Sequence, residues 1–205
     1  MSNFTDSLKA RAKKSIKTIV LAEGEELRTL KAAEIVISEG YAKVILLGNP
    51  DKINTLAKDE NVNIAGIPII DPENSEKNEE YANAFYELRK KKGVTPEQAA
   101  ETIKNSLYYG VMMVKQGDAD GMVAGAVNSS ANVLRPSLQI LKTAPGTKLV
   151  SAFFIISVPN CEYGENGTFI FADSGLNENP DADQVSEIAI SSAKSFKQLV
   201  EAEPK

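Results

Sequence analysis

The chain has 205 residues, of which 42% are hydrophobic and 25% charged, and its formal net charge is −5. That composition is typical of a soluble globular protein, and it offers no basic stripe for nucleic acid, no membrane-length apolar run and no signal peptide. A single cysteine, Cys161, fits a reducing cytoplasm, and the complete absence of histidine excludes every Ser-His and Cys-His nucleophile pair.

The first half of the chain alternates short apolar runs with helical patterns. Buried strands are predicted at 17–24, 43–48 and 67–72, each followed by a helical pattern. The first helix should end at Gly40, the second should open at Pro50, and the third should begin near Ser75, a suitable N-cap. Strands separated by helices imply a parallel sheet with helices on both faces, which is an α/β fold.

The second half begins with a helix start at Thr95, followed by Pro at the first helical position and Gln three residues on. A strand is predicted at 120–127, with a helix running on to about Lys142. Pro136 belongs either to the first turn of that helix or to a kink in a helix that starts earlier. Two apolar strands and an amphipathic helix follow, at 148–159, 167–173 and 183–201.

The end of the chain is unusual for this alternation. It stops on a helix where another strand is due, so we expect a piece of a longer protein with an unfinished second sheet. Apolar surface should then be exposed on the strands near 153–156 and 169–171. The residue Cys161 lies in the hairpin-like loop between them and has no activating neighbour in sequence, so an ordinary thiol is expected.

The segment from Gly125 to Arg135 joins a predicted strand to a predicted helix. Small residues at the carboxyl end of a parallel strand leave room for a ligand, and short polar side chains beside a helix start offer donors. The arginine adds a planar fork that binds phosphate oxygens in two places. This pattern favours an anion site, although the same residues are also typical of a capped helix with a surface arginine. The polar side chains of the segment are Asn128, Ser129, Ser130, Asn132 and Arg135.

Two further polar clusters have ordinary explanations beside functional ones. Arg89 and the lysines after it sit at a predicted helix C-terminus, where cations favour the helix dipole, although a second guanidinium would also suit a phosphorylated substrate. The acidic and amide residues of 173–183 lack a recognised calcium-binding order. We expect Asp181 or Asp183 to cap the last helix and Asp173 to orient groups at the sheet edge, rather than a metal site.

Four stretches together resemble the phosphate acetyltransferase (phosphotransacetylase) family, in order and over the whole chain. They are AEGEELR, ELRKKKGVT, DADGMVAGAVNSSANVLRPSLQILKTAPG and FIFADSGLNENP. The resemblance implies two α/β domains of the isocitrate/isopropylmalate dehydrogenase-like kind, with the site between them. The first domain would cover 1–145, and 146–205 would be the start of an incomplete second domain, because family members are longer than this chain.

The resemblance also implies a reaction, namely reversible transfer of an acetyl group between CoA and orthophosphate in acetate metabolism by direct attack of the CoA thiolate. Arg135 matches a catalytic arginine of the family, while Arg89, Arg28, Ser129 and Ser130 match substrate-binding positions. No metal and no cofactor is implied, since CoA is a substrate. Many members have histidine and aspartate where this chain has Asn128 and Asn132, so side-chain roles at those two positions stay open.

The remaining implications concern the whole protein. The catalytic base and the CoA-binding groups would lie beyond residue 205, so the fragment alone is expected to be inactive. The expected partners are acetyl phosphate, phosphate and CoA, with no nucleic acid and no membrane, in a cytoplasmic homodimer. Butyryl transfer is an alternative reaction, and a non-catalytic ligand-binding or regulatory domain is an alternative of another class.

Overall fold

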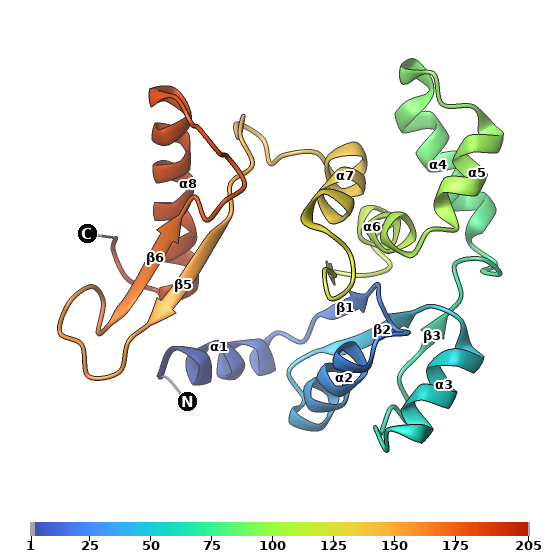
Figure 1. Cartoon of the computed structure of the whole chain (residues 1–205), viewed down its shortest axis with the longest axis horizontal. Helices are drawn as coiled ribbons and strands as arrows, with labels where there is room; N and C mark the ends of the chain where they lie inside the picture. Colours follow the sequence, from blue (N-terminus) through green and yellow to red (C-terminus); the bar gives the residue numbers. More distant parts are fainter. Residues whose placement is uncertain (1–2, 205) are drawn as a thin grey trace. The chain divides into compact units, whose positions relative to one another are not determined.

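The computed structural model describes residues 3–204 and divides the chain into two compact units, each of which is drawn in Figure 1. The larger unit comprises residues 12–142. The smaller unit joins the described N-terminal residues up to 11 with 143–204. Within the described part of the chain, none of the helices has both the length and the apolar character to cross a membrane.

The larger unit contains a sheet of four parallel strands in the order β3-β2-β1-β4. The central pair aligns Thr18 with Lys43 and Leu21 with Leu46. The predicted parallel α/β arrangement is thus confirmed, although the third strand is much shorter than its apolar run suggested. The strands are β1 (Thr18–Leu21), β2 (Lys43–Leu47), β3 (Ile69–Ile70) and β4 (Gly121–Val123).

Helices cover both faces of this sheet, as expected from the alternation of strands and helices (Figure 1). Side chains of β1 alternate between two apolar clusters, with Val20 in one and Leu21 in the other, because successive residues of a strand point to opposite faces. One face carries α2 (Leu27–Glu39) and α3 (Pro50–Asp59). The other carries α4 (Asn78–Arg89), α5 (Pro96–Ile103), α6 (Ser106–Gln116) and α7 (Ser130–Ile140), with the short 3-10 turn η1 (Lys90–Lys92) after α4.

Local capping signals place several helix ends correctly. Thr95 and Gln98 form a reciprocal capping box at α5, and Gly40 ends α2 in a left-handed conformation with φ of 71°. Pro136 lies inside α7, so the earlier-starting helix is the correct alternative. The expected start at Ser75 is wrong, because α4 begins at Asn78 and the Ser75 hydroxyl instead pairs with the Tyr109 hydroxyl.

The smaller unit is a hairpin packed against a helix. Strands β5 (Phe153–Ser157) and β6 (Thr168–Ala172) pair antiparallel, and α8 (Ala182–Val200) contacts β6. Of the two expected caps, Asp181 and not Asp183 is the N-cap of α8. Arg11 of α1 (Asn3–Lys14) donates to carbonyl groups at the far end of α8. The exposed apolar surface expected on these strands is present, since Phe154 is 63% and Phe171 56% exposed.

Candidate functional site

The carboxyl ends of the four parallel strands meet at one edge of the larger unit's sheet. The chain leaves β1 for α2 on one face, and it leaves the adjacent strand β4 for α7 on the other face. Neighbouring strands whose connections leave in opposite directions open a crevice, which is where ligands bind in open α/β sheets. The loops after β1 and β4 are therefore the first place to look for a site.

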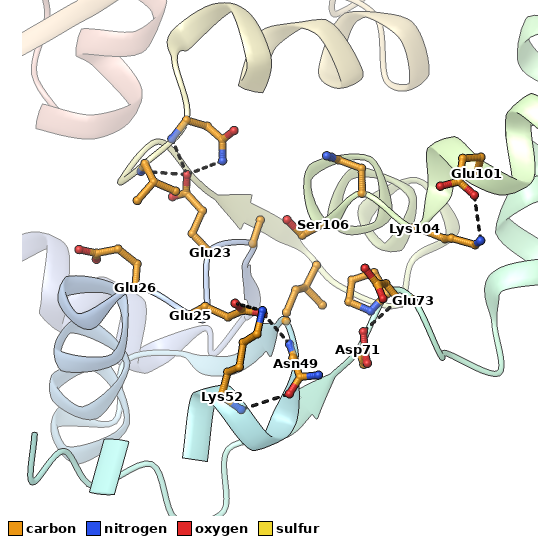
Figure 2. A pocket seen from close by; sticks show the side chains of 18 residues that line it. Glu23, Glu25, Glu26, Asn49, Lys52, Asp71, Glu73, Glu101, Lys104 and Ser106 are labelled. Carbon is orange, nitrogen blue, oxygen red and sulfur yellow. Dashed lines mark hydrogen bonds and ion pairs between the residues drawn. The ribbon is translucent and has the colours of Figure 1, made fainter. Parts of the chain in front are cut away.

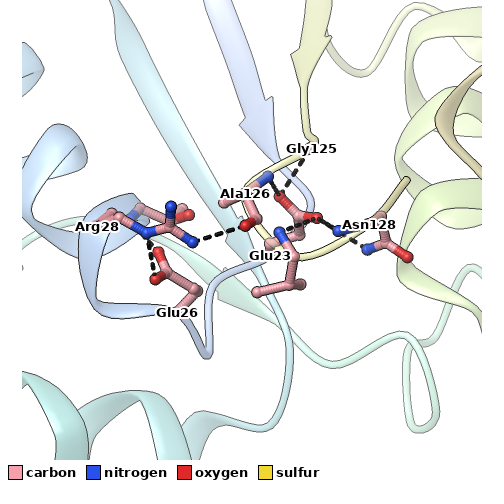
Figure 3. A network of polar contacts seen from close by, with 8 residues as sticks. Glu23, Glu26, Arg28, Gly125, Ala126 and Asn128 are labelled. Carbon is pink, nitrogen blue, oxygen red and sulfur yellow. Dashed lines mark hydrogen bonds and ion pairs between the residues drawn. The ribbon is translucent and has the colours of Figure 1, made fainter. Parts of the chain in front are cut away.

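The crevice between these loops is occupied by the carboxylate of Glu23, which follows β1 (Figure 3). Its Oε2 accepts from the N–H groups of Gly125 at 2.8 Å and Ala126 at 2.6 Å. Its Oε1 accepts from the N–H groups of Val127 at 3.1 Å and Asn128 at 2.9 Å, and from the Asn128 side-chain amide at 2.8 Å. Five donors thus enclose one carboxylate, and we call this group of residues the Glu23 nest.

The backbone of the nest depends on its first residue. Gly125 has a φ of +114°, a conformation that residues with a side chain rarely adopt, and an added Cβ would meet nothing within 4 Å. Glycine is required here by backbone conformation. The small residues Gly125 and Ala126 were predicted to leave room for a ligand, but their N–H groups donate to Glu23.

Glu23 is 8% exposed, yet it is a stable anion. Burial raises its pKa, but the hydrogen bonds from the Asn128 side chain and from the backbone of the nest lower it by more, so that the pKa falls to about 2. The carboxylate therefore remains charged at every physiological pH.

Arg28 holds the same loop from the side of α2 (Figure 3). Its Nη2 donates to the carbonyl oxygen of Ala126 at 2.6 Å, and its Nε donates to Glu26, the N-cap residue of α2, at 2.7 Å. The side chain is 70% exposed, so most of the guanidinium still faces solvent. Arg28, which we selected as a substrate-binding residue, is thus at least a link between the loops after β1 and β4.

A pocket of about 590 Å³ lies along the same edge of the sheet (Figure 2). It is lined from the loops after all four strands and from the junction of α5 and α6. Its charged residues are six carboxylates and two lysines: Glu23, Glu25, Glu26, Asp71, Glu73, Glu101, Lys52 and Lys104. Both lysines are paired within the pocket, Lys52 with Glu25 at 3.1 Å and Lys104 with Glu101 at 2.8 Å.

This excess of carboxylates makes the pocket a poor site for a phosphorylated ligand, because like charges repel. None of the five site residues chosen from the sequence lines it. The pocket shares with the predicted site only the loop after β4, through Val127 and Asn128.

The predicted serines lie at the start of α7, one and two residues beyond the nest. Ser129 is the N-cap, and its hydroxyl accepts from the N–H of Asn132 at 3.3 Å. Ser130 is the first helical residue, and both serines are exposed. The first N–H groups of a helix have no acceptor within it, so this terminus presents donors to solvent.

The remaining predicted residues are two arginines, Arg135 and Arg89. Arg135 is exposed on α7 and makes no ion pair or hydrogen bond with residues 3–204. It lies four residues after Ala131, hence on the same helical face, and side chains of this kind lean toward the helix N-terminus. Arg89 ends α4, which packs against α7, and its Nε is buried without a hydrogen-bond partner in the described structure.

Glu23 was not among the predicted site residues, and the side-chain role of Asn128, which was left open, is to donate to Glu23. Residue 23 falls inside the strand predicted at 17–24, whereas β1 ends at Leu21 and leaves Glu23 in the loop that follows. Asp173, by contrast, does orient backbone groups as expected, accepting from Gly175 and Leu176. The residues that the structure describes include no group of three or more potential metal ligands of the His, Cys, Asp or Glu type.

Comparison with known proteins identifies the class of protein to which this chain belongs. A family model described as "Phosphate acetyl/butaryl transferase" matches residues 3–205, so the chain belongs to the phosphate acetyl/butyryl transferase family. The phosphate acetyltransferase of Acetivibrio thermocellus is 63% identical over 202 residues, which are 98% of this chain and 60% of that protein. That of Thermoanaerobacterium thermosaccharolyticum is 54% identical, over 99% of this chain and 61% of that protein.

Solved structures agree with the sequence relatives. The EutD phosphotransacetylase from Staphylococcus aureus superposes with a TM-score of 0.87 at 37% identity, over 97% of this chain and 58% of that one. A phosphotransacetylase from Streptococcus pyogenes gives a TM-score of 0.89 at 33% identity, over 98% of this chain and 60% of that one. The chain therefore spans about 60% of the length of these relatives.

Proposed function

We propose that the protein is a phosphate acetyltransferase, which catalyses reversible acetyl transfer between CoA and orthophosphate. The observation that carries the proposal concerns two arginines of the described residues. Arg135 of α7 has no ion-pair or hydrogen-bond partner among residues 3–204, and the buried Nε of Arg89, on the helix that packs against α7, has none either. Buried polar groups normally have a partner, so an orphaned arginine nitrogen suggests an absent ligand. Relatives at 63% and 54% identity that are named phosphate acetyltransferases support the same reaction.

In this proposal the phosphoryl group lies against the first turn of α7. Arg135 supplies a bidentate contact, Ser129, Ser130 and the free N–H groups orient the oxygens, and Arg89 and Arg28 complete the positive surroundings. Donors aimed at a developing negative charge lower the barrier to attack on the acetyl carbonyl. Direct attack by the CoA thiolate needs no enzyme nucleophile, which suits a chain without histidine.

Several finer expectations belong to the same proposal. They are an isocitrate/isopropylmalate dehydrogenase-like arrangement of two α/β domains, divided near residue 145, a cytoplasmic homodimer, and catalysis without a cofactor. The family resemblance supports each of them.

The proposal is tested by Arg135→Lys and Arg135→Ala in the full-length protein, with CoA-dependent loss of acetyl phosphate followed at the thioester absorbance. Lysine lacks the planar fork, so both variants should reduce kcat/KM for acetyl phosphate by at least about tenfold while thermal unfolding is unchanged. Two folded variants with wild-type kcat/KM would make Arg135 a surface residue. If the wild type prefers butyryl phosphate, the reaction is butyryl transfer. If it turns over neither acetyl phosphate nor butyryl phosphate, the non-catalytic alternative is favoured.

A further inference from the structure

We propose that Glu23 is a positioning residue for this reaction: its carboxylate is a built-in anion that sets the loop from Gly125 to Asn128, so that substrate phosphate is received by the first turn of α7. The inference rests on the function proposed above. It concerns a residue that contacts neither phosphate nor CoA and acts through the loop that it holds.

The first step concerns the capacity of the nest. A carboxylate has about four lone-pair sites, and Glu23 receives five hydrogen bonds of 2.6 to 3.1 Å. The carboxylate is therefore saturated, and the backbone donors of the loop have no capacity left for a second anion. A phosphate approaching the crevice would also meet the charge of Glu23, so the crevice that usually receives the ligand in this fold class is closed to it.

The second step concerns what the nest holds in place. Asn128 is bound to Glu23 through both its backbone N–H and its side-chain amide. Ser129 and Ser130 follow it directly, so the start of α7 is about 4 to 8 Å of chain from the nest. Fixing Asn128 therefore fixes the N-cap of α7, and the helix carries Arg135 as a rigid extension.

The third step concerns the opposite side of the loop. Arg28 binds the carbonyl of Ala126, whose N–H is bound to Glu23 (Figure 3). One peptide segment is thus held by an anion at its donors and by a cation at an acceptor. Misplacement of a binding group by about 1 Å costs on the order of a hundredfold in rate, so loss of either contact should be visible in kinetics.

The experiment compares three variants of the full-length protein, Glu23→Ala, Glu23→Gln and Asp120→Asn. Asp120 is the matched control, because it also accepts a backbone N–H, from Thr18 at 2.8 Å, but at the opposite end of β4. Both Glu23 variants should raise KM for acetyl phosphate at least about tenfold and change KM for CoA by less than about threefold. The control should match the wild type. Formate, a carboxylate small enough for the vacated nest, should lower KM for acetyl phosphate in Glu23→Ala toward the wild-type value and have no effect on the control.

Hydrogen exchange provides a readout that does not depend on activity. The amides of residues 125 to 128 should lose more protection in Glu23→Gln than those of β1 and β2, whose protection should fall only by the loss in global stability. Faster exchange with unchanged KM for acetyl phosphate would overturn the positioning role, as would equal increases in KM for both substrates. If Glu23→Ala does not fold, Glu23→Gln decides the matter by the same criteria.

A separate measurement distinguishes failure of this inference from failure of the proposed function. If the wild-type protein shows no CoA-dependent turnover, the proposed function fails. The affinity for inorganic phosphate, measured by calorimetry, then serves as the readout in place of KM for acetyl phosphate. Phosphate affinity at least about tenfold weaker in Glu23→Gln than in the wild type would still support the positioning role. Equal affinity, or no phosphate binding by the wild type, would overturn it.

Discussion

Each unit of the molecule contains a carboxylate held in the same way, Glu23 after β1 in the larger unit and Asp173 after β6 in the smaller one. In each case the first donor is a glycine at positive φ, +114° for Gly125 and +111° for Gly175, with its N–H 2.8 Å from the carboxylate. An asparagine side chain donates in each case as well, from Asn128 at 2.8 Å and from Asn177 at 2.6 Å.

The electrostatics of the two carboxylates also agree. Burial raises the pKa of Asp173, but hydrogen bonds from the backbone of Leu176, from the Asn177 amide and from two further N–H groups outweigh it and lower the pKa to about 2. The pKa of Glu23 falls to the same value for the same reason. The pKa and the kinds of hydrogen-bond donor therefore do not distinguish the two sites.

The difference lies in sequence separation. The donors to Glu23 are 102 to 105 residues away, whereas most donors to Asp173 are two to four residues away, with Ala152 at 21. Asp173 shapes a turn that would form beside it in any case. Glu23 joins two loops that would otherwise be independent, so its removal should have a larger effect.

The largest effect is expected for Glu23→Gln. The amide that replaces the charged oxygen would face N–H donors, and the fall in pKa from 4.5 to about 2 corresponds to about 3 kcal/mol of stabilisation. Urea unfolding at pH 7 should show a loss of that order in the free energy of unfolding. Asp173→Asn should lose less, since water reaches its turn, and an equal loss would remove the distinction between the long-range and the local nest.

Acid should reproduce part of this loss in the wild type. A carboxylate with a folded pKa below its unfolded value stabilises the protein above the unfolded pKa, and that contribution declines as the pH falls toward the folded pKa. For Glu23 the window runs from about pH 4.5 down to about 2, with about 2 kcal/mol lost by pH 3. The free energy of unfolding should fall less steeply with decreasing pH in Glu23→Gln than in the wild type. Parallel pH curves for the two proteins would contradict the assignment.

The asparagines provide a smaller and better matched test. Asn128→Ser removes one charge-assisted hydrogen bond of five, and Asn177→Ser removes the corresponding bond to Asp173 together with a neutral bond to the carbonyl of Val150. The charge-assisted bond should contribute about 1.5 kcal/mol to the free energy of unfolding in each case, and Asn177→Ser should lose somewhat more because of the second bond. Only Asn128→Ser should also raise KM for acetyl phosphate, and a kinetic effect of Asn177→Ser would show that the smaller nest is not merely local.

The glycines should give the smallest difference. Neither Gly125 nor Gly175 would place a new Cβ within 4 Å of another group, so substitution by alanine tests backbone conformation alone. Each substitution should cost about 1–2 kcal/mol of strain at positive φ. Thermal unfolding of Gly125→Ala and Gly175→Ala should give similar shifts, and a larger shift for Gly125 would show that loop closure adds to local strain.

What could be predicted from the sequence follows the same division into local and long-range contacts. The capping box of Thr95 was predicted, and Asp181 was one of the two predicted candidates for the cap of α8, because a cap and its donors lie within three residues. Asp173 was predicted to orient groups for the same reason. Ser75 was a plausible N-cap by type, but its hydroxyl pairs with Tyr109, 34 residues away, and no local pattern could show that contact.

The candidate site divides in the same way. The strand, cap and helix that carry Ser129 and Arg135 were recognised from the order of residue types. Glu23, which binds this loop, was not recognised, because it lies about 100 residues away in the sequence and no local pattern around Gly125 indicates the contact. The third strand is shorter than the predicted 67–72, since only Ile69 and Ile70 pair with β2. This too depends on tertiary contacts.

The wide separation within the Glu23 nest also sets an order of events during synthesis. At roughly 5–20 residues per second, Asn128 leaves the ribosome about 5 to 20 s after Glu23. Over that interval β1 can pair with β2, but the strand edge that later receives β4 stays open, and open strand edges invite pairing with other chains. Stalled nascent chains ending before residue 121 should therefore be more sensitive to protease around β1 than chains that have released Asn128.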